Sequence, residues 1–366
     1  MLGWVEVAHL VLVNLSYLSD KPTGISTYTQ NVYPYLKPLN PILLTREPIE
    51  GYRCHRIPGF MTPEQGMRGH ISRLLWTQFR LPSLSRRLRS RLLFSPLPEA
   101  PIYSYSRYVV VVYDLIPLRF PQGQWHLSYY HRYILPKVVT QARHVICISQ
   151  STADDVMAFF GVRANRITPI PLAYDRLNFR PQSLPNRLDR PYFLYLGRQA
   201  PYKNVQSVIS AFAALPERDN YELWLAGPTD RRHTPRWQQL TKELGIREQV
   251  KFMEYVPYEK LPQLIAQAIA LVFPSLWEGF GLPVLEAMAC GTPVITSNVS
   301  SLPEVAGDAA LLVDPYNLDE LIAAMHAIAT DYNLRDNLSE LGLLRSSEFS
   351  WAKTGQQTLE VLKFYA

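Results

Sequence analysis

The chain has 366 residues, of which 47% are hydrophobic and 19% are charged, and its formal net charge is +6. This length exceeds one ordinary hydrophobic core and predicts two globular domains. No stretch is apolar for long enough to cross a membrane, and the positive charge favours an anionic partner such as a nucleotide, a nucleic acid or an acidic lipid.

The N-terminal stretch MLGWVEVAHLVLVNLSYL is apolar, but it contains Glu6, His9 and Asn14. It lacks a basic leader and a small-residue cleavage site, so we expect a first buried strand and not a signal peptide. The three cysteines are widely spaced and odd in number, which predicts neither a disulfide framework nor a metal site and fits a reducing cytosol. We therefore expect a cytoplasmic protein.

Apolar runs that end at turn residues alternate with amphipathic stretches in the first half of the chain. The expected elements are the strands Val5–Leu15, Tyr108–Val112 and His144–Ile148 and the helix Ser26–Leu36. The hydroxyl residues that begin at Ser149 stand where a helix N-cap belongs, with Asp154 and Asp155 expected in the first turn. The alternation predicts an α/β domain with a mainly parallel sheet.

The pattern lapses in the polar, proline-containing stretch Ala173–Arg190, which we expect to be a linker between domains 1–175 and 176–349. Alternation then resumes and predicts a second α/β domain. Its expected strands are Tyr192–Leu196, Tyr221–Ala226, Val250–Met253, Leu271–Phe273 and Leu311–Val313. Its expected helices are Asn204–Leu215, Trp237–Leu244, Leu261–Ala270, Leu318–Thr330 and Asp331–Leu343, and a last helix covers about 350–366.

Ligands of open α/β sheets bind at the carboxyl ends of the strands. The residues that directly follow predicted strands are Gly24, Asp114, Ser149, Gly197, Arg198, Gly227 and Glu278. Two such sheets facing each other would form a cleft lined from both domains.

The stretch Phe273–Val299 predicts a strand end, a loop, a helix and the next strand, and it holds Glu278 and Glu286. Pro283 suits a first helical turn. The amides of Phe280, Gly281 and Leu282 would then form an anion site at the helix N-terminus, beside a carboxylate suited to sugar hydroxyls. The alternative is an ordinary turn with a surface glutamate.

Other candidate residues each have a plain structural alternative. Arg198 and Lys203 flank a helix start and would bind a pyrophosphate, or they are two surface cations. Gly24 would let a ligand approach the backbone, or it is a turn glycine. Asp114 would hold a sugar hydroxyl or an acceptor, or it caps a turn.

The segment Arg68–Arg91 contains seven arginines, and no Asp or Glu lies between Glu64 and Glu99. Large apolar residues are interleaved with the arginines. This pattern is typical of a segment that contacts an anionic membrane surface. The alternative is a solvated basic face on a helix that packs on the core.

Several classes of function lack their motifs. The histidines form no HxxxH pair or His/Cys cluster and there is no DxD element, so no metal site is expected. There is no GxSxG elbow, no GxxxxGK[ST] loop and no GxGxxG fingerprint. Nucleic-acid binding is not expected, because no recognised nucleic-acid motif accompanies the basic segment.

Several segments form a recognisable set when they are taken together. They are EGFGLPVLE at 278–286, PTGISTYT, VVVYDLIPLRF, VICISQSTADDV, LYLGRQAPYKN, LWLAGP, VKFMEYVPYEKLPQLIAQA and the terminal FSWAKT helix. This set resembles retaining glycosyltransferases of family 4 (GT4), most closely the bacterial mannosyltransferase-type members that build polysaccharide chains, and the resemblance covers nearly the whole chain.

This resemblance implies a GT-B fold, in which two Rossmann-like domains face each other across a cleft and the C-terminal helix returns to the N-terminal domain. It implies that Glu278 contacts the donor sugar and that Glu286 holds the ribose. Arg198 and Lys203 would neutralise the pyrophosphate. The remaining donor-side positions implied are Gly24, Gly197, Gly227, Tyr255, Val256, Phe280, Gly281 and Leu282.

The sequence departs from the family pattern at two positions. Tyr113 stands where many relatives have a histidine before Asp114, and these two residues are expected on the sugar or acceptor side. Glu254 replaces the usual glycine before the aromatic residue of the base-binding loop.

The expected reaction is transfer of a hexose with retention, first from GDP-mannose, to a saccharide or lipid-linked acceptor, with no cofactor and no metal required. The leaving phosphate would help to deprotonate the acceptor. The alternatives are a UDP-glucose-dependent transferase, a nucleotide-sugar epimerase or hydrolase, and a non-catalytic nucleotide-sugar-binding subunit.

Overall fold

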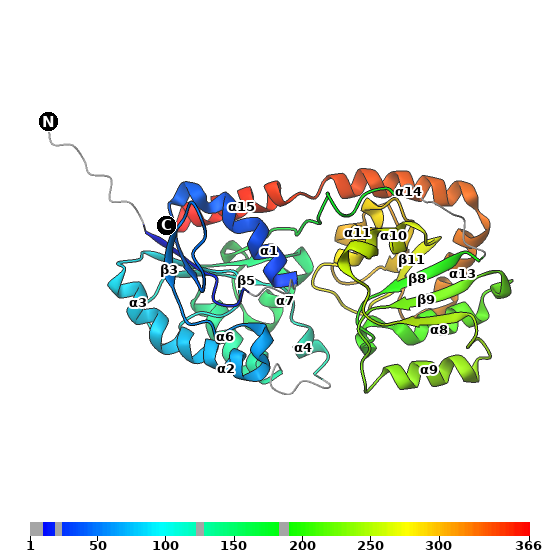
Figure 1. Ribbon diagram of the computed structural model, residues 1–366, viewed down its shortest axis with the longest axis horizontal. Coiled ribbons are helices and arrows are strands. Elements are labelled where there is room, and N and C mark those ends of the chain that lie inside the picture. The colour runs from blue at the N-terminus through cyan, green and yellow to red at the C-terminus, as the bar shows by residue number, and fades with distance from the viewer. Residues whose placement is uncertain (1–9, 19–23, 122–127, 183–189) are drawn as a thin grey trace. The chain divides into compact units, whose positions relative to one another are not determined.

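The computed structural model describes residues 10–18, 24–121, 128–182 and 190–366, which form two compact units (Figure 1). Unit 1 comprises the chain up to Leu172 together with Trp351–Ala366, and unit 2 comprises Ala173–Ser350. The sequence placed these divisions at residues 175 and 350. The predicted strand Val5–Leu15 begins outside the described residues.

Unit 1 contains one sheet in the order β3-β2-β1-β4-β5-β6-β7, and every neighbouring pair is parallel. Its strands are β1 (Val11–Asn14), β2 (Ile42–Thr45), β3 (Arg53–Arg56), β4 (Leu92–Ser95), β5 (Tyr108–Val112), β6 (His144–Cys147) and β7 (Ile167–Pro169). Most are fully buried, as apolar strands covered on both faces must be.

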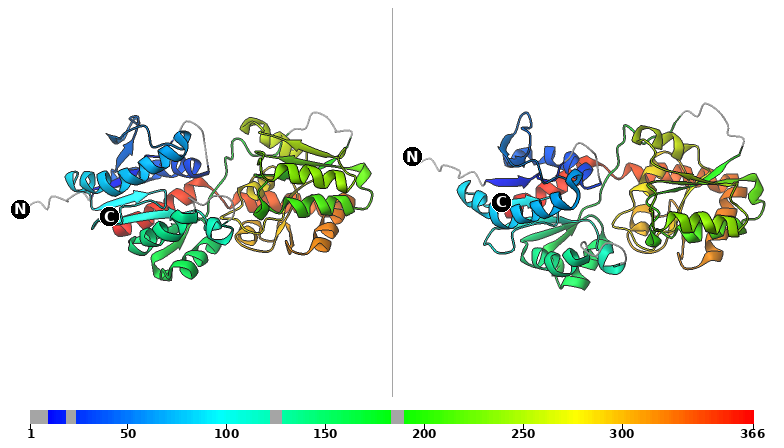
Figure 2. Two further views of the ribbon diagram at one scale, coloured as in Figure 1. Left: turned by 90° about the horizontal axis from the view of Figure 1, so that it is seen from below. Right: turned by 60° about the horizontal axis from the view of Figure 1, so that its bottom comes forward.

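The helices of unit 1 cover both faces of this sheet (Figures 1 and 2). They are α1 (Gly24–Val32), α2 (Gly66–Leu75), α3 (Leu81–Arg87), α4 (Ile116–Arg119), α6 (Leu135–Gln141), α7 (Gln150–Phe160) and α15 (Trp351–Tyr365). Short 3-10 turns are η1 (Tyr33–Leu39), η2 (Pro63–Gln65) and η5 (Ala164–Arg166), and π-helical turns are η3 (Trp76–Arg80) and η4 (Tyr130–Ile134). One core joins α2, α3, α6 and α7 to the sheet.

Prolines explain where these helices change character. The predicted helix Ser26–Leu36 is α-helical only to Val32, because Pro34 and Pro38 lack the N–H that an α-helix needs, and the chain continues as a 3-10 turn. The π-turn η3 likewise ends next to Pro82, where Leu81 N donates to Trp76 O.

The N-cap of α7 confirms one prediction and corrects another. Ser149 Oγ accepts the amide of Thr152 at 3.0 Å, as expected. Asp154 and Asp155 were expected in the first turn, but no acidic residue lies there. Asp155 is buried and pairs with Arg119, so its role is structural.

The last helix, α15, belongs to unit 1, as the family resemblance implied, and packs beside α1 and η1 (Figure 1). Thr358, Leu359 and Leu362 are buried there. Thr354 Oγ1 donates to Pro171 O at 2.8 Å. Sixteen residues from the far end of the chain therefore complete the core of the first unit.

Unit 2 contains a second parallel sheet in the order β10-β9-β8-β11-β12-β13. Its strands are β8 (Tyr192–Leu196), β9 (Glu222–Ala226), β10 (Val250–Met253), β11 (Ala270–Phe273), β12 (Val294–Ser297) and β13 (Leu311–Val313). The two sheets and their helices confirm the predicted α/β architecture.

The helices of unit 2 lie on both faces of its sheet (Figure 1). They are α8 (Val205–Ala214), α9 (Thr234–Glu243), α10 (Leu261–Ala266), α11 (Leu282–Ala289), α12 (Leu302–Ala306), α13 (Leu318–Thr330) and α14 (Tyr332–Ser347), with 3-10 turns η6 (Pro201–Lys203), η7 (Arg218–Asn220) and η8 (Tyr258–Lys260). Helix α11 packs on α14, and α8 packs on α13.

The stretch Ala173–Arg190 is more than a linker. Phe179 is buried and its ring lies edge-on to Tyr258, with 5.5 Å between the ring centroids. The described part, which stops at Gln182 and resumes at Arg190, thus packs onto unit 2, while residues 183–189 lie outside the described residues.

Candidate functional site

The order of the second sheet reverses between two central strands. From β8 the chain moves to β9 and β10 on one side, and then returns to β11 on the other side of β8. Such a switch point leaves a crevice at the carboxyl ends of the two strands, where α/β sheets bind ligands. Gly197 and Arg198 follow β8, and the loop 274–281 follows β11.

The loop after β11 is shaped by Gly281, which caps α11 with φ 112°. The amides of Phe280, Gly281 and Leu282 have no acceptor within the helix, because they lie before or at its first residue. Ser301 Oγ donates to Phe280 O at 2.8 Å and holds the loop in place. The Phe280 side chain is buried, so only its backbone is placed to meet a ligand.

Lys203 and Glu278 meet at this edge of the sheet. Lys203 Nζ lies 2.6 Å from Glu278 Oε1, and the two side chains are 14% and 9% exposed. Lys203 Nζ also lies 5.1 Å from the centroid of the Phe273 ring. The Glu278 amide donates to Ser300 Oγ at 3.0 Å. A cation and a carboxylate predicted to bind different parts of one ligand are therefore paired with each other.

Arg198 is exposed next to this pair. Its carbonyl accepts the Tyr195 hydroxyl at 2.9 Å. Burial and the nearby Glu278 carboxylate hold the pKa of Tyr195 well above its usual value. Within the described part of the chain, the Arg198 guanidinium has no carboxylate partner, so it is available to an anion.

The two turn glycines, Gly197 and Gly227, are packed backbone to backbone. Their φ angles are 150° and 136°. A Cβ added at Gly227 would lie 2.2 Å from Gly197 O. Close packing alone therefore requires glycine at 227, and contact of either residue with a donor stays a prediction.

The loop after β10 reaches the same turn, because Gly227 N donates to Glu254 O at 3.4 Å. Tyr255 follows and is 75% exposed. Val256 is partly buried. These two residues are thus placed near the turn that the sequence assigned to the donor, although their contact with a base stays a prediction.

Glu286 lies near a second carboxylate, that of Asp175. It lies in the second turn of α11, and burial together with Asp175 raises its pKa to about 8. The Tyr258 hydroxyl donates to Asp175 Oδ2 at 3.5 Å. The sequence missed Asp175, since it lies in the stretch expected to be a linker and no motif marks it.

Buried polar atoms without a partner mark the switch points of both sheets. In unit 2 these atoms are Gln199 Nε2 and Ser275 Oγ, which follow β8 and β11. In unit 1 they are Asn14 Nδ2, Ser16 Oγ and Ser95 Oγ, at the ends of β1 and β4. Leaving such a group unsatisfied costs about 1–3 kcal/mol. They are therefore candidate contacts for a ligand or water that sequence reasoning missed.

The remaining predicted residues belong to unit 1. Tyr113 donates its hydroxyl to Pro96 O at 2.9 Å, and burial raises its pKa well above the usual value. Asp114 Oδ1 accepts the amide of Ile116 at 3.0 Å, so at least one of its oxygens serves the turn. Gly24 is the first residue of α1, and a Cβ there would meet nothing within 4 Å.

Among the described residues, no three His, Cys, Asp or Glu side chains are grouped so as to hold a metal ion. The same residues include no helix that is both long and apolar enough to span a bilayer.

Two family models match the chain in succession. Residues 22–176 match the model described as Glycosyltransferase Family 4, and residues 178–343 match the model described as Glycosyl transferases group 1. The first match lies in unit 1 but for its last residues, and the second lies in unit 2.

Two bacterial mannosyltransferases are similar in sequence. The O-antigen chain mannosyltransferase B of Escherichia coli is 35% identical over 241 residues, which are 63% of this chain and 62% of that protein. The serotype-specific mannosyltransferase WbdA of the same species is 31% identical over 266 residues, or 69% of this chain. The match covers only 33% of WbdA, so this chain corresponds to part of that relative's length.

A solved structure shares the fold. Alr3699/HepE of Anabaena, in complex with UDP and glucose, superposes with a TM-score of 0.74 at 18% identity, over 97% of this chain and 99% of that one.

Proposed function

This chain belongs to glycosyltransferase family 4 and has the GT-B fold, and on that premise we propose that it transfers mannose from GDP-mannose to a saccharide or lipid-linked acceptor, with retention and without a metal ion. The observation that carries the proposal is the Lys203–Glu278 pair at the switch point of the second sheet, beside the N-terminus of α11. The mannosyltransferase relatives support the choice of sugar.

The chemistry of the proposed reaction follows from the charges at this site. A departing nucleoside diphosphate gains negative charge as the sugar leaves. Lys203 and Arg198 supply fixed positive charge, and the amides at 280–282 add donors that need no reorganisation. Lys203 is paired with Glu278, so a donor diphosphate that binds here would take over Lys203, and Glu278 would turn to the sugar hydroxyls.

The acceptor side of the proposal rests on unit 1. Its switch point carries two buried polar atoms without a partner, Asn14 Nδ2 and Ser95 Oγ, and Asp114 stands near the same ends of the strands. Hydroxyl and carboxamide groups suit a saccharide acceptor. All three cysteines, Cys54, Cys147 and Cys290, are free thiols, which is consistent with a cytoplasmic location.

The test uses the full chain with labelled GDP-mannose and, separately, UDP-glucose, each with and without EDTA. UDP-glucose is included because the structure similar to this chain was solved with UDP and glucose. We expect transfer from GDP-mannose that survives EDTA. Loss of activity on chelation would refute metal independence, exclusive use of UDP-glucose would refute the sugar, and donor binding without transfer would favour a non-catalytic subunit.

The matched variants are Arg198→Ala and Arg236→Ala. Both arginines are exposed in unit 2, but Arg236 lies on α9. Arg198→Ala removes a fixed positive charge from the proposed diphosphate site and should lower kcat by about 10²–10³. Arg198→Ala should leave thermal stability unchanged, and Arg236→Ala should alter neither property. Equal activity of the two variants would place the phosphate site elsewhere.

A further inference from the structure

A continuous helix in unit 1, Gly66–Arg87, exposes a stripe of large apolar side chains. It consists of α2, η3 and α3, and it buries Trp76 and Leu81 against the sheet. Its outward residues Met67, Ile71, Leu75 and Phe79 recur every four residues and are 42%, 49%, 54% and 68% exposed. Four large apolar residues on the solvent side of one helix mark an interaction surface.

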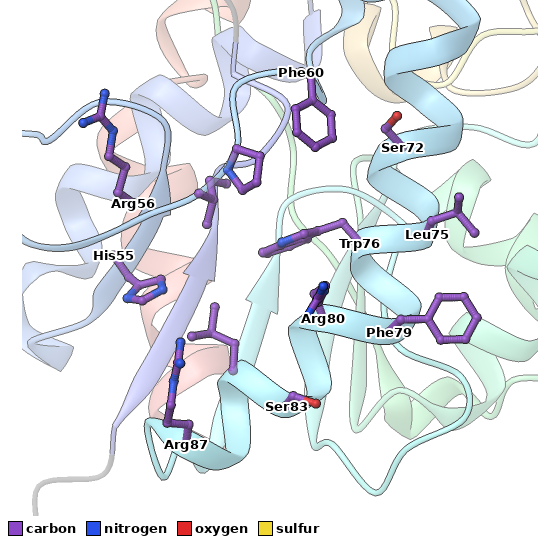
Figure 3. A pocket seen from close by; sticks show the side chains of 13 residues that line it. His55, Arg56, Phe60, Ser72, Leu75, Trp76, Phe79, Arg80, Ser83 and Arg87 are labelled. Carbon is purple, nitrogen blue, oxygen red and sulfur yellow. The ribbon is translucent and has the colours of Figure 1, made fainter.

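Two grooves flank this stripe. The first, of about 790 Å³, lies between the helix and the segment after β3, and Figure 3 shows the Trp76 ring turned into it. The second, of about 800 Å³, lies on the other side, against the 103–107 segment. Both grooves share Phe79 and Ser83, so the Phe79 ring stands on a ridge between them.

Arginines line both grooves, and no carboxylate does. Arg56, Arg80 and Arg87 line the first groove, and Arg86, Arg91 and Arg107 line the second. Of the seven arginines in 68–91, four line these grooves, namely Arg80, Arg86, Arg87 and Arg91, and one is turned inward. Arg73 is buried, and its Nε donates to Glu99 Oε2 at 2.7 Å.

The alternative, in which these arginines are only the solvated basic face of a helix that packs on the core, explains only part of this arrangement. Arg86 and Arg87 lie in the last turn of α3, where cations stabilise a helix C-terminus. Arg56, whose guanidinium lies 3.7 Å from Glu47 Oε1, also has a structural partner. Neither role accounts for the exposed apolar stripe or for the gathering of arginines from several elements at the two grooves. A second copy of the chain is a poor occupant, because facing copies would bring arginine-lined grooves together without a carboxylate between them.

We propose that this surface docks on the anionic headgroup layer of a lipid bilayer. Leu75 and Phe79 enter the boundary of the acyl chains, and the arginines of the two grooves bind lipid phosphates. An apolar ridge between two cationic grooves matches a bilayer surface, in which negative phosphates lie above hydrocarbon. The proposal concerns unit 1 alone and does not depend on which nucleotide sugar the second unit binds.

The experiment measures co-sedimentation of the full chain with vesicles of phosphatidylcholine alone, and of phosphatidylcholine mixed with phosphatidylglycerol. Arg80, Arg86 and Arg87 are replaced together by Gln, and the control replaces Arg132, Arg143 and Arg163, which are exposed elsewhere in unit 1. Each cation near an anionic bilayer contributes roughly a fivefold factor in binding. We expect the surface variant to bind the anionic vesicles on the order of 100-fold more weakly, and the control to bind like the wild type.

A second pair of variants tests the apolar ridge. Leu75→Ser with Phe79→Ser should weaken binding to the anionic vesicles by at least tenfold. Leu344→Ser with Phe364→Ser is the control, since these residues are 68% and 81% exposed on other helices. All four variants change exposed side chains, so unchanged circular dichroism and thermal unfolding establish that each is folded.

Three results would overturn the proposal. Equal weakening by the two arginine variants would mean that only net charge matters. No binding of wild type to the anionic vesicles would exclude a lipid surface. A lipid-free dimer in sedimentation velocity that Leu75→Ser with Phe79→Ser converts to a monomer would show that a second copy covers the ridge.

Discussion

Glu278 and Glu286 are similar in the sequence but differ in their electrostatic surroundings. Glu278 is paired with Lys203 at 2.6 Å. Glu286 is close to Asp175, and burial with this like charge raises its pKa to about 8. The two carboxylates, eight residues apart, thus have opposite surroundings: Glu278 lies beside a cation, and Glu286 lies near a second carboxylate that helps to hold its pKa above the usual value.

The Glu286 carboxyl predicts a pH dependence of stability. Its pKa is raised from 4.5 in the unfolded chain to about 8 in the folded protein. Its favourable contribution is therefore complete below pH 4.5 and is lost as the pH rises through 8. The glutamine in Glu286→Gln stays neutral, so the Tm of this variant should rise relative to that of wild type as the pH increases from 4.5 to about 8. Glu340→Gln, an exposed change on α14, is the control, and a constant Tm difference for Glu286→Gln would contradict the prediction.

Ligand binding should respond to pH in the opposite sense. If the ionised Glu286 accepts ribose hydroxyls, as the family resemblance implies, nucleotide affinity of wild type rises as the pH passes through about 8. Glu286→Gln should lose this slope. Calorimetric titration with GDP at several pH values measures both slopes, and an unchanged slope in the variant would remove Glu286 from the ribose site.

At the scale of elements, the sequence was most informative where a strand is rich in apolar residues. Tyr108–Val112, Tyr192–Leu196, Val250–Met253 and Leu311–Val313 have the predicted bounds, as does the helix Leu318–Thr330. The short strands β2, β3, β4 and β7 were not predicted. In β3 the letters RCHR carry no apolar signal, because this edge strand is partly exposed. A single proline follows each π-turn. The helical periodicity of apolar residues in the sequence does not reveal such a local change of helix type.

The candidate site was predictable only in part, for a similar reason. Motif residues such as Lys203 and Glu278 were identified from local sequence, and the structure joins them. Asp175 and Ser300 approach the same region from distant segments with no motif of their own. Only the folded chain brings their side chains into contact with the motif residues.

Substitution at the turn formed by Gly197 and Gly227 tests whether glycine is required there for folding, independently of any role in ligand binding. Gly227→Ala would place a Cβ 2.2 Å from Gly197 O at φ 136°, and both atoms belong to rigid backbone. We expect a loss of about 1–3 kcal/mol or more in unfolding free energy. Chemical denaturation measures it, and a loss near zero would mean that the turn can open freely.

Gly24→Ala is the matched control, because a Cβ at Gly24 would meet nothing within 4 Å and the position begins a helix. Its stability should equal or slightly exceed that of wild type. If a donor phosphate approaches this backbone, as predicted, the variant should still lose donor affinity. Wild-type affinity in Gly24→Ala would show that Gly24 is an ordinary turn glycine.

At the scale of the whole molecule, the last segment of the chain completes unit 1. Unit 2 is inserted between Leu172 and Trp351, so unit 1 has its full core only when α15 has been added. Leu359 and Leu362 on this helix are 3% and 0% exposed. Gly355 is packed so closely that a Cβ there would lie 2.3 Å from the Tyr35 ring.

Deleting Trp351–Ala366 should therefore destabilise unit 1 and spare unit 2, because each unit has its own sheet and core. Hydrogen exchange followed by mass spectrometry should show faster exchange in α1 and in the strands β1 and β5, with β8 and β11 unchanged. In the full-length chain, Leu362→Ala should produce a milder form of the same pattern, at a cost of about 2–5 kcal/mol. Equal loss of protection in β8 and β11 would mean that the two units unfold as one cooperative body, and the return of α15 would then stabilise the whole chain and not the first unit alone.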